Sequence, residues 1–381
     1  MRSVLIAFAD DTLGGTSRSA LGWGQVYAEA GWQVLFRPMR GIHPRRTAAF
    51  RAVGTVIDDY DDLRGTEPPL LSLHHGAWSK RMLTEVRSLA VWTESQWSVP
   101  LDIISNNIFA VSDRVIDQAF PRSRHTTAVL GDWAFAQYIS NTAGTRRSAA
   151  VTVVPNPQDD AFFRPPSLQE RDAARRRLQI PEGSKVVLRL GSPHEGKWSA
   201  SYDQLVSALE DATLILVGSP ESLRLRLRGK SGIRLIEPLG DDEAVRELYW
   251  AADVFAHDAV RGESFGNVIV EAMLCGIPVV YRGRPLRDNT PHEFVDLPGF
   301  YYCGSTRAWI TVLSQQEALS SSRVLSNEVG RYGVSQLSQL LRKTEEIGRV
   351  PVRLPLAARA VIFLLHNPLV AALKQARLNR R

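Results

Sequence analysis

The sequence predicts an α/β protein made of two doubly wound domains. Its 381 residues are enough for two domains that each bury a full core. In both halves, short apolar strands alternate with helices, a pattern typical of right-handed crossovers and parallel sheets. The first strand also runs into a glycine loop and then a helix, which is how a doubly wound domain opens.

In the first half, functional residues are expected where strands end. The predicted strands are residues 4–8, 33–36, 55–57, 70–73, 108–111 and 151–154. Gly14, Gly15 and Thr16 lie between the first strand and a helix predicted over 18–30. This loop lacks the G-x-G-x-x-G pattern, which argues against a dinucleotide dehydrogenase. Residues 121–150 show no clear period.

His74 and His75 end the strand over 70–73, at the edge where open α/β sheets bind ligands. Adjacent residues of a strand point to opposite faces, so at most one of the two side chains is expected to reach a given ligand. The alternative is one half-buried, hydrogen-bonded histidine beside an exposed one.

The second half repeats the strand and helix rhythm after a proline-rich linker at 162–166. Its predicted strands are residues 185–190, 213–217, 253–256 and 278–281. Arg189 ends the first of these strands, and Lys197 lies in the glycine-rich loop after it. Two fixed cations at such an edge neutralise a diphosphate and stabilise it as a leaving group. The alternative is a solvated basic loop.

The stretch RGESFGNVIVEAMLCGIPVV, residues 261–280, carries two carboxylates, Glu263 and Glu271. Their eight-residue spacing corresponds to a helical rise of ~12 Å. That exceeds the roughly 5–9.5 Å between the carboxyl groups of a glycosidase. Glu263 also precedes the predicted helix, whose unpaired N–H groups favour anions. The pattern therefore indicates a site for a ligand with a phosphate and several hydroxyls.

This stretch resembles the E-x7-E signature of the retaining GT-B glycosyltransferases of the large family 4, also called glycosyl transferases group 1. The loop G-S-P-H-E-G-K-W-S after residue 190 is similar to that family's loop with an Arg and Lys pair, although Ser192 replaces the second Arg. The segment V-P-N-P at 154–157 has Pro157 where the family usually has glycine. The resemblance implies the GT-B fold: two Rossmann-like domains that face each other across a cleft, with C-terminal helices crossing back.

The resemblance also implies roles for individual residues. Arg189 and Lys197 would draw off the nucleoside diphosphate, and Glu263 would orient the donor sugar. His74, with His75 as its substitute, would contact that sugar. The implied donor-binding residues are Gly14, Gly15, Thr16, Pro238, Leu239, Ser264, Phe265, Gly266, Asn267 and Glu271, the last holding the ribose. Asp288 and Glu293 resemble a further family segment and support the domain assignment.

Composition limits the partners. The net charge is +6, but residues 349–381 hold seven Lys or Arg and no acidic residue, so the remainder carries 6 − 7 = −1. A nucleic-acid-binding body is therefore not expected. The basic tail either packs on the first domain or lies on an anionic membrane surface. Two cysteines give no disulfide framework, and neither a signal peptide nor a spanning helix is expected, which favours a cytoplasmic, peripheral protein.

The predicted domains are an acceptor-binding domain over 1–164, a nucleotide-sugar-binding domain over 165–340 and a basic helical tail over 341–381. The predicted activity is sugar transfer from a nucleoside-diphosphate sugar to a hydroxyl of a glycan, glycolipid or polysaccharide precursor, with retention and with neither cofactor nor metal. The alternatives are a GT-B sugar-nucleotide epimerase or phosphorylase, and a non-catalytic membrane-associated subunit.

Overall fold

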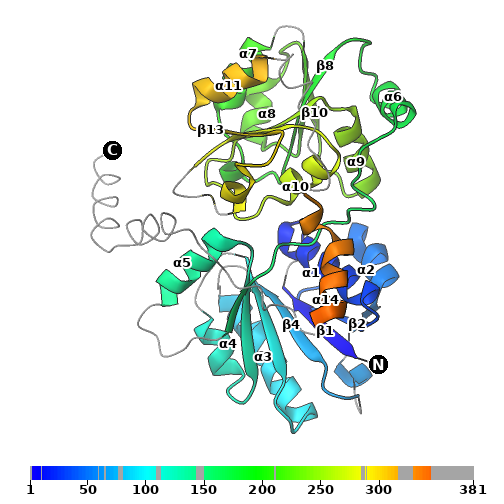
Figure 1. The fold of residues 1–381 in the computed structure, drawn as a ribbon, viewed down its shortest axis with the longest axis vertical. Coiled ribbons are helices and arrows are strands. Elements are labelled where there is room, and N and C mark those ends of the chain that lie inside the picture. The colour runs from blue at the N-terminus through cyan, green and yellow to red at the C-terminus, as the bar shows by residue number, and fades with distance from the viewer. Residues whose placement is uncertain are drawn as a thin grey trace. The chain divides into compact units, whose positions relative to one another are not determined.

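The chain forms two compact units in a computed structural model (Figure 1). One unit comprises residues 1–157 and 338–381, and the other comprises residues 158–337. The structure describes residues 2–9, 11–58, 60–63, 66–75, 80–108, 113–142, 150–209, 212–284, 288, 290–315 and 329–344. Each unit contains a parallel β-sheet flanked by helices, so the predicted α/β class with two doubly wound domains is confirmed.

The first unit is built on a seven-stranded sheet in the order β3-β2-β1-β4-β5-β6-β7. Its strands are β1 (Ser3–Phe8), β2 (Gln33–Pro38), β3 (Thr55–Val56), β4 (Leu70–His75), β5 (Asp102–Asn107), β6 (Arg124–Val129) and β7 (Ala150–Val153). Its helices are α1 (Gly15–Glu29), α2 (Thr47–Val53), α3 (Lys80–Gln96), α4 (Arg114–Ala119) and α5 (Asp132–Thr142), with short 3-10 turns at Pro44–Arg46 and Tyr60–Leu63. The central strands are apolar and buried because helices cover them, as in the cluster of Leu5, Leu73 and Val86.

The second unit is built on a six-stranded sheet in the order β10-β9-β8-β11-β12-β13. Its strands are β8 (Lys185–Leu190), β9 (Ala212–Val217), β10 (Ile233–Ile236), β11 (Val254–His257), β12 (Val279–Arg282) and β13 (Phe300–Cys303). Its helices are α6 (Leu168–Arg177), α7 (Ser201–Ala208), α8 (Glu221–Leu227), α9 (Asp242–Ala251), α10 (Asn267–Leu274) and α11 (Thr306–Ser314), with 3-10 turns at Glu195–Lys197, Thr290–Phe294 and Gly330–Tyr332. Trp309 of α11 is fully buried and donates its indole N–H to the carbonyl of Val280, 3.0 Å away.

Both sheets reverse their strand order beside their first strand, at β1 and β4 in one unit and at β8 and β11 in the other. Loops that follow the two neighbouring strands diverge to opposite faces of the sheet at such a point, which leaves room for a ligand at the carboxyl ends. Ligand-binding residues are therefore expected in the segments after β1, β4, β8 and β11.

The chain returns to the first unit through α14 (Val334–Thr344), which lies beside α1 in Figure 1. Ser338 donates its hydroxyl to a Glu29 carboxylate oxygen at 3.0 Å, and the Arg342 guanidinium donates to the Glu29 carbonyl. These contacts confirm that C-terminal helical structure crosses back. The remainder of the predicted tail, residues 345–381, lies outside the described residues.

The sequence did not predict β5, β6 or α5 of the first unit. The strand β5 ends at Asn107, before the strand expected at 108–111, of which residues 109–111 lie outside the described residues, so that expected strand stays a prediction. The region 121–150, which shows no period, contains β6 and α5. Ser105 and Thr127 are fully buried polar residues within β5 and β6, so these strands are not the apolar runs that mark a buried strand.

Smaller corrections concern helix ends. The first helix begins at Gly15 and not at Arg18, so Gly15 and Thr16 belong to its first turn. Farther along the chain, a 3-10 turn at Gly330–Tyr332 precedes α14, and Gly333 lies between the two.

Candidate active site

The candidate site lies at the carboxyl edge of the second sheet, around the adjacent strands β8 and β11. The loops after these strands are joined, because the Arg261 N–H donates to the Gly196 carbonyl at 3.0 Å. A side chain from beyond β12 also contributes, since the Glu263 N–H donates to Asp288 Oδ1 at 3.0 Å. Three segments far apart in the sequence are thus fixed to one another at the edge where parallel sheets bind ligands.

Gly266 sets the start of α10. It has φ +86°, in the left-handed region that favours glycine. A Cβ there would lie 2.7 Å from Ile269 Cδ1 and 3.1 Å from Glu263 Cγ. This tight turn brings the start of α10 close to the Glu263 side chain. Phe265 is buried against Tyr332, while Ser264 and Asn267 are half-buried.

Lys197 and Glu263 form an ion pair, with 2.6 Å between Lys197 Nζ and Glu263 Oε1. The lysine side chain is 36% exposed and the glutamate side chain 9%. The Ser264 N–H also donates to Oε1, at 3.2 Å. The structure therefore brings together two residues that lie 66 positions apart and that the sequence assigns to one site.

Asp288 anchors the turn that carries Glu263. Its Oδ1 accepts from the Glu263 N–H and from the Tyr281 hydroxyl, the latter at 2.5 Å. Its Oδ2 accepts from the Tyr302 hydroxyl at 3.1 Å and from the Arg284 N–H. Burial raises the pKa of the Asp288 carboxyl, although these hydrogen bonds oppose the shift. A single carboxylate thus holds the ends of β12 and β13 and the turn before α10 together.

Arg189 is 1% exposed, so the structure places it beneath the site surface. Its guanidinium donates to the Tyr202 hydroxyl at 3.0 Å, to the Lys197 carbonyl at 2.8 Å and to the Leu190 carbonyl. It also lies over the Trp198 ring, 4.7 Å from the centroid. In this arrangement Arg189 supports the loop that carries Lys197, and contact with a ligand phosphate remains a prediction.

Glu271 lies inside α10 and is fully buried. The Tyr249 hydroxyl of α9 donates to its Oε2 at 2.9 Å and lies 3.2 Å from the Val268 carbonyl. Its ribose-binding role remains a prediction. Tyr249 fixes the orientation of this carboxylate, and no sequence motif identifies it.

The residues that follow β8, β9 and β10 meet at one corner of the sheet, at Gly191, Gly218 and Pro238. Gly218 has φ +70°, and a Cβ there would meet the Gly191 carbonyl oxygen at 2.2 Å and Pro238 Cγ at 3.7 Å. Pro238 and Leu239 follow β10 and are half-buried. The backbones of Gly218 and Gly191 are therefore packed against each other, with the Pro238 ring beside them. This placement agrees with the nucleobase role that the resemblance implies, which remains a prediction.

The other predicted donor-binding residues lie in the first unit. Gly14 caps α1 after β1, and its N–H donates to Thr12 Oγ1 at 2.9 Å. Gly15 is exposed and Thr16 is half-buried. These residues therefore lie at the helix N-terminus that follows the first strand.

Both predicted histidines are buried, in contrast to the alternative in which one of them is exposed. His74 is 0% exposed, and its ring nitrogens lie 3.2 Å from Ser19 Oγ, Ser72 Oγ and Asn106 Nδ2. Burial, with a contribution from the neighbouring His75, lowers the pKa of His74 to about 3. The ring is therefore neutral at physiological pH and is held by polar neighbours.

His75 belongs to a second buried network. Its Nε2 lies 2.5 Å from Ser105 Oγ and 3.3 Å from Asp113 Oδ1. Asp113 also accepts from the Thr127 hydroxyl at 2.5 Å. Burial acts to raise the pKa of Asp113, but the contacts with His75, Thr127 and His125 outweigh it and lower that pKa. Both predicted histidines thus take part in internal hydrogen bonding.

His257 is a site residue that the sequence did not reveal. It ends β11, one residue past the predicted strand, is fully buried and stacks on Tyr281 with 5.1 Å between ring centroids. Burial, together with the charges of Arg189 and Lys197, holds the pKa of His257 well below its usual range. The next residue, Asp258, is buried between the guanidinium groups of Arg282 and Arg284 at 3.2 Å and 2.7 Å. Its position at the end of a predicted strand was the signal from which the sequence could have identified it.

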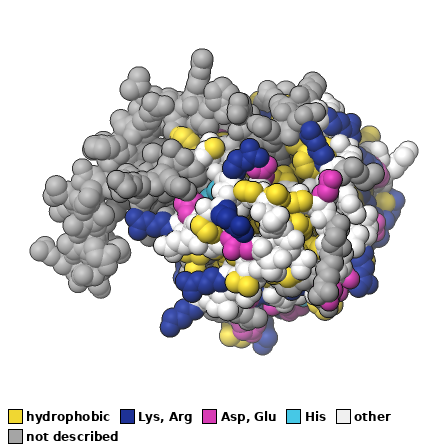
Figure 2. Space-filling view, turned by 90° about the horizontal axis from the view of Figure 1, so that it is seen from below, with side chains coloured by type: hydrophobic (Ala, Val, Ile, Leu, Met, Phe, Trp, Pro, Cys, Tyr) yellow, Lys and Arg dark blue, Asp and Glu magenta, His cyan; other side chains and the backbone are white. Residues whose placement is uncertain are grey.

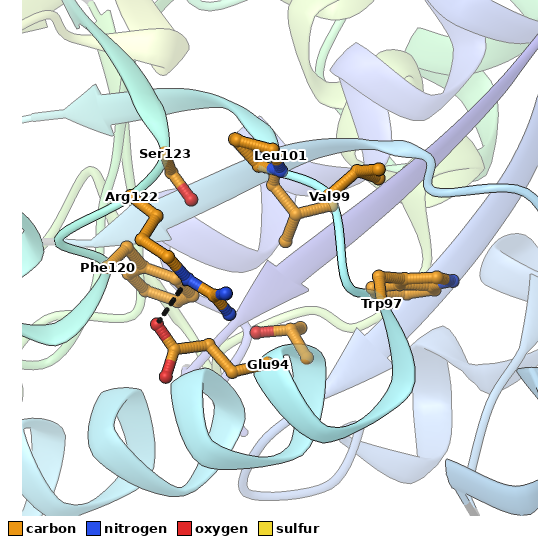
Figure 3. Close-up of a pocket in the computed structure, with 9 residues that line it drawn as sticks. Glu94, Trp97, Val99, Leu101, Phe120, Arg122 and Ser123 are labelled. Atoms are coloured by element: carbon orange, nitrogen blue, oxygen red, sulfur yellow. Dashed lines mark ion pairs between the residues drawn. The ribbon is translucent and has the colours of Figure 1, made fainter.

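A shallow depression elsewhere on the first unit does not correspond to the predicted site (Figure 3). It is lined by Trp97, Leu101 and Phe120 and is crossed by an exposed ion pair of Glu94 with Arg122, 4.0 Å apart. It lies at the amino ends of β5 and β6, opposite to the edge where parallel sheets bind ligands.

The visible face in Figure 2 shows basic and acidic side chains interspersed among polar and apolar ones. Within the ranges described, no helix is long and apolar enough to cross a membrane. The same ranges hold no group of three or more His, Cys, Asp or Glu placed to bind a metal ion. Membrane contact and metal independence both remain predictions.

Part of the chain is similar to known glycosyltransferases. Residues 198–288 match the glycosyl transferases group 1 family, and that segment contains Glu263, Glu271 and Asp288. The chain is 37% identical to a phosphatidyl-myo-inositol mannosyltransferase of Mycobacterium leprae over 108 residues, which are 26% of this chain and 29% of that protein. It is 27% identical to a D-inositol 3-phosphate glycosyltransferase of Corynebacterium jeikeium over 292 residues, 64% of this chain and 68% of that protein. The match thus spans less than a third of the first relative.

Solved structures decide the architecture. HepE from Anabaena, in complex with UDP and glucose, superposes with a TM-score of 0.68 at 17% identity, covering 91% of this chain and 99% of that one. WaaG, a glycosyltransferase involved in lipopolysaccharide biosynthesis, superposes with a TM-score of 0.57 at 15% identity, covering 96% and 100%. The fold is GT-B. At these identities the likeness establishes the fold, and the activity requires a separate argument.

Proposed function

We propose that the protein is a glycosyltransferase that moves a sugar from a nucleoside-diphosphate sugar to a hydroxyl acceptor. The ion pair of Lys197 and Glu263 beside the N-terminus of α10 carries the proposal. It places a partly exposed cation for a phosphate next to a carboxylate for sugar hydroxyls, at the switch point of a GT-B domain. Relatives named as glycosyltransferases and the solved complex of HepE with UDP and glucose support this assignment.

In the proposed reaction, the bond between the anomeric carbon and the diphosphate oxygen breaks while a bond to the acceptor oxygen forms on the same face of the sugar. Lys197 stabilises the charge that develops on the departing diphosphate. Glu263 and the backbone from Phe265 to Asn267 orient the sugar. The proton of the acceptor hydroxyl passes to the departing phosphate. Retention of configuration and independence from a metal are parts of the proposal that the E-x7-E resemblance supports.

The remaining donor contacts in the proposal rest on the family resemblance. Glu271 would hold the ribose, and the backbone beside Pro238 and Leu239 would receive the base. The first unit would supply the acceptor site, for a glycan or a lipid-linked precursor. A cytoplasmic location with peripheral contact to an anionic membrane surface through the basic tail completes the proposal.

The experiment that tests this function is a thermal-shift panel with UDP, GDP, ADP and TDP, first without metal and then with Mg²⁺. A ligand at 100 times its Kd stabilises the native state by about 2.7 kcal/mol. For a domain of this size, that corresponds to a Tm rise of roughly 5–10 °C. We expect one diphosphate to give such a rise without metal and Glu271→Ala to abolish it.

Glu247→Ala is the matched control, because Glu247 lies in the same unit but forms an outer ion pair with Arg177 at 2.7 Å. It is expected to keep the full shift. If none of the four diphosphates raises the Tm of the wild-type protein, the proposed function is overturned and a non-catalytic GT-B subunit is favoured. In a separate assay with a nucleoside-diphosphate sugar, conversion of that sugar in the absence of an acceptor would favour an epimerase.

A further inference from the structure

His257 is a buried histidine with two unsatisfied ring nitrogens. Among the described residues, neither Nδ1 nor Nε2 has a hydrogen-bond partner, and the side chain is 1% exposed. In a neutral imidazole one ring nitrogen is a donor and the other an acceptor, so two polar functions are unsatisfied. Buried polar atoms in native proteins are nearly always paired, and an exception calls for an explanation.

The nearest charged group is the Glu263 carboxylate, whose two oxygens have different surroundings. Oε1 receives Lys197 Nζ at 2.6 Å and the Ser264 N–H at 3.2 Å. Oε2 lies 3.6 Å from His257 Nε2, which is just beyond hydrogen-bond distance. The ring therefore faces the less occupied oxygen of the residue that is proposed to orient the sugar.

We propose that His257 is a positioning residue that takes over the Glu263 carboxylate when a diphosphate ligand draws Lys197 away from it. The inference rests on the proposed function and adds an exchange of partners to it. In the free protein, Lys197 holds Glu263. In the complex, Lys197 binds the phosphate and the His257 N–H donates to Glu263 Oε2.

The exposures of the two ion-pair partners decide which of them moves. Lys197 is 36% exposed on a flexible stem and is able to follow a phosphate, whereas Glu263 is 9% exposed and its backbone is anchored by Asp288. When Lys197 leaves, Oε1 keeps the Ser264 N–H, but the largely buried negative charge has lost its cation, which is disfavoured. The His257 ring lies 3.6 Å from Oε2 and is able to donate.

The frame around the ring is rigid, so a small movement of the carboxylate completes the exchange. His257 stacks on Tyr281, and the Tyr281 hydroxyl donates to Asp288, the same carboxylate that fixes the Glu263 backbone. A normal N–H···O distance is about 2.9 Å, so Oε2 needs to approach the ring by well under 1 Å. A turn of the Glu263 side chain is sufficient for this.

The test compares two variants that remove the ring but differ in the donor. His257→Gln retains an N–H donor near the position of Nε2, and His257→Leu retains none. Isothermal titration measures their affinity for UDP, inorganic pyrophosphate and uridine. We expect His257→Leu to weaken UDP and pyrophosphate by about tenfold or more, because a hydrogen bond to a charged group is lost. We expect His257→Gln to remain within about threefold of wild type, and uridine binding to respond to neither change.

A spectroscopic measurement on the wild-type protein keeps the test independent of variant folding. Imidazole ¹H–¹⁵N spectra report whether the His257 N–H is hydrogen-bonded. We expect its proton to move downfield when UDP or pyrophosphate is added. In Lys197→Ala, the downfield signal is expected already in the free protein, because Glu263 then has no lysine to hold it.

The outcomes separate the two proposals. If UDP binds the wild-type protein, but His257→Leu binds it equally well and the imidazole signal does not move, the exchange is overturned and the function stands. If no diphosphate binds the wild-type protein, the function fails. The free Lys197→Ala spectrum then still tests whether His257 pairs with Glu263, and an unmoved signal overturns the exchange.

Discussion

The carboxyl edges of the two sheets hold similar side chains in different states of satisfaction. At the end of β4, His74 is surrounded by three polar atoms at 3.2 Å, and His75 contacts Ser105 and Asp113. At the end of β11, His257 has no hydrogen-bond partner among the residues described. All three side chains are buried, so burial alone does not distinguish them.

The two buried aspartates, Asp113 at the first edge and Asp288 at the second, have pKa values shifted in opposite directions. Asp113 has a histidine beside it, and its pKa is lowered despite burial. Asp288 is bound by neutral donors, and burial raises its pKa. At the edge of the first unit, His74, His75 and Asp113 each have hydrogen-bond partners, which is typical of a structural network. The edge of the second unit combines an unpaired histidine with a partly exposed ion pair, which is typical of a site that awaits a ligand.

Among the variants that test this comparison, Lys197→Ala is expected to have the largest effect, a loss of kcat. Removing a cation that stabilises the leaving diphosphate should lower kcat roughly 10²–10³-fold. Steady-state transfer assays with the diphosphate sugar identified by the thermal-shift panel measure it. Lys185→Ala is the control, because Lys185 begins the same strand at its opposite, amino end. Equal kcat losses in both variants would contradict the assigned role.

Lowering the pH should reduce the stability of the first unit, because His74 is held neutral in the fold. The folded-state pKa of His74 is about 3, whereas an unfolded histidine has a pKa of about 6.5. The contribution of the neutral ring to stability is therefore fully present above pH 6.5 and is lost as the pH falls toward 3, by about 1.4 kcal/mol per unit. Between pH 6.5 and 4.5 this amounts to about 3 kcal/mol.

Urea unfolding of the wild-type protein and of His74→Gln at pH 7 and pH 4.5 measures this effect. The gap in the free energy of unfolding between the two proteins should move in favour of the variant by about 3 kcal/mol at the lower pH. A gap that is the same at both pH values would show that His74 is not held neutral by the fold.

The smallest effect is expected from Tyr249→Phe, which removes the hydroxyl that donates to Glu271 at 2.9 Å. Loss of one such hydrogen bond, worth about 1 kcal/mol, should raise the donor Kd about fivefold. Tyr138→Phe is the matched control, since its hydroxyl lies 3.2 Å from Thr127 in the network of the first unit. Titration calorimetry that finds no difference between the variants would contradict the coupling of Tyr249 to the donor site.

The sequence was sufficient for the fold class because the strands of the second unit are short apolar runs between helices. It failed at β5 and β6, where Ser105 and Thr127 are buried through side-chain hydrogen bonds that a pattern of apolar residues does not represent. It grouped Lys197 with Glu263 through a family resemblance, and the structure places them 2.6 Å apart.

The sequence by itself determined the α/β rhythm and the candidate carboxylates, because these depend on local backbone preferences and on the spacing of neighbouring residues. Only the tertiary structure decided which polar side chains are satisfied. His74 and His257 both lie at the carboxyl end of a buried strand. One partner of His74, Ser72, is two residues away, but Ser19 and Asn106 are 55 and 32 residues away. Hydrogen bonds between side chains depend on distances that are set when separate strands and helices pack together. Those distances give His74 its partners and, among the described residues, leave His257 without a hydrogen bond.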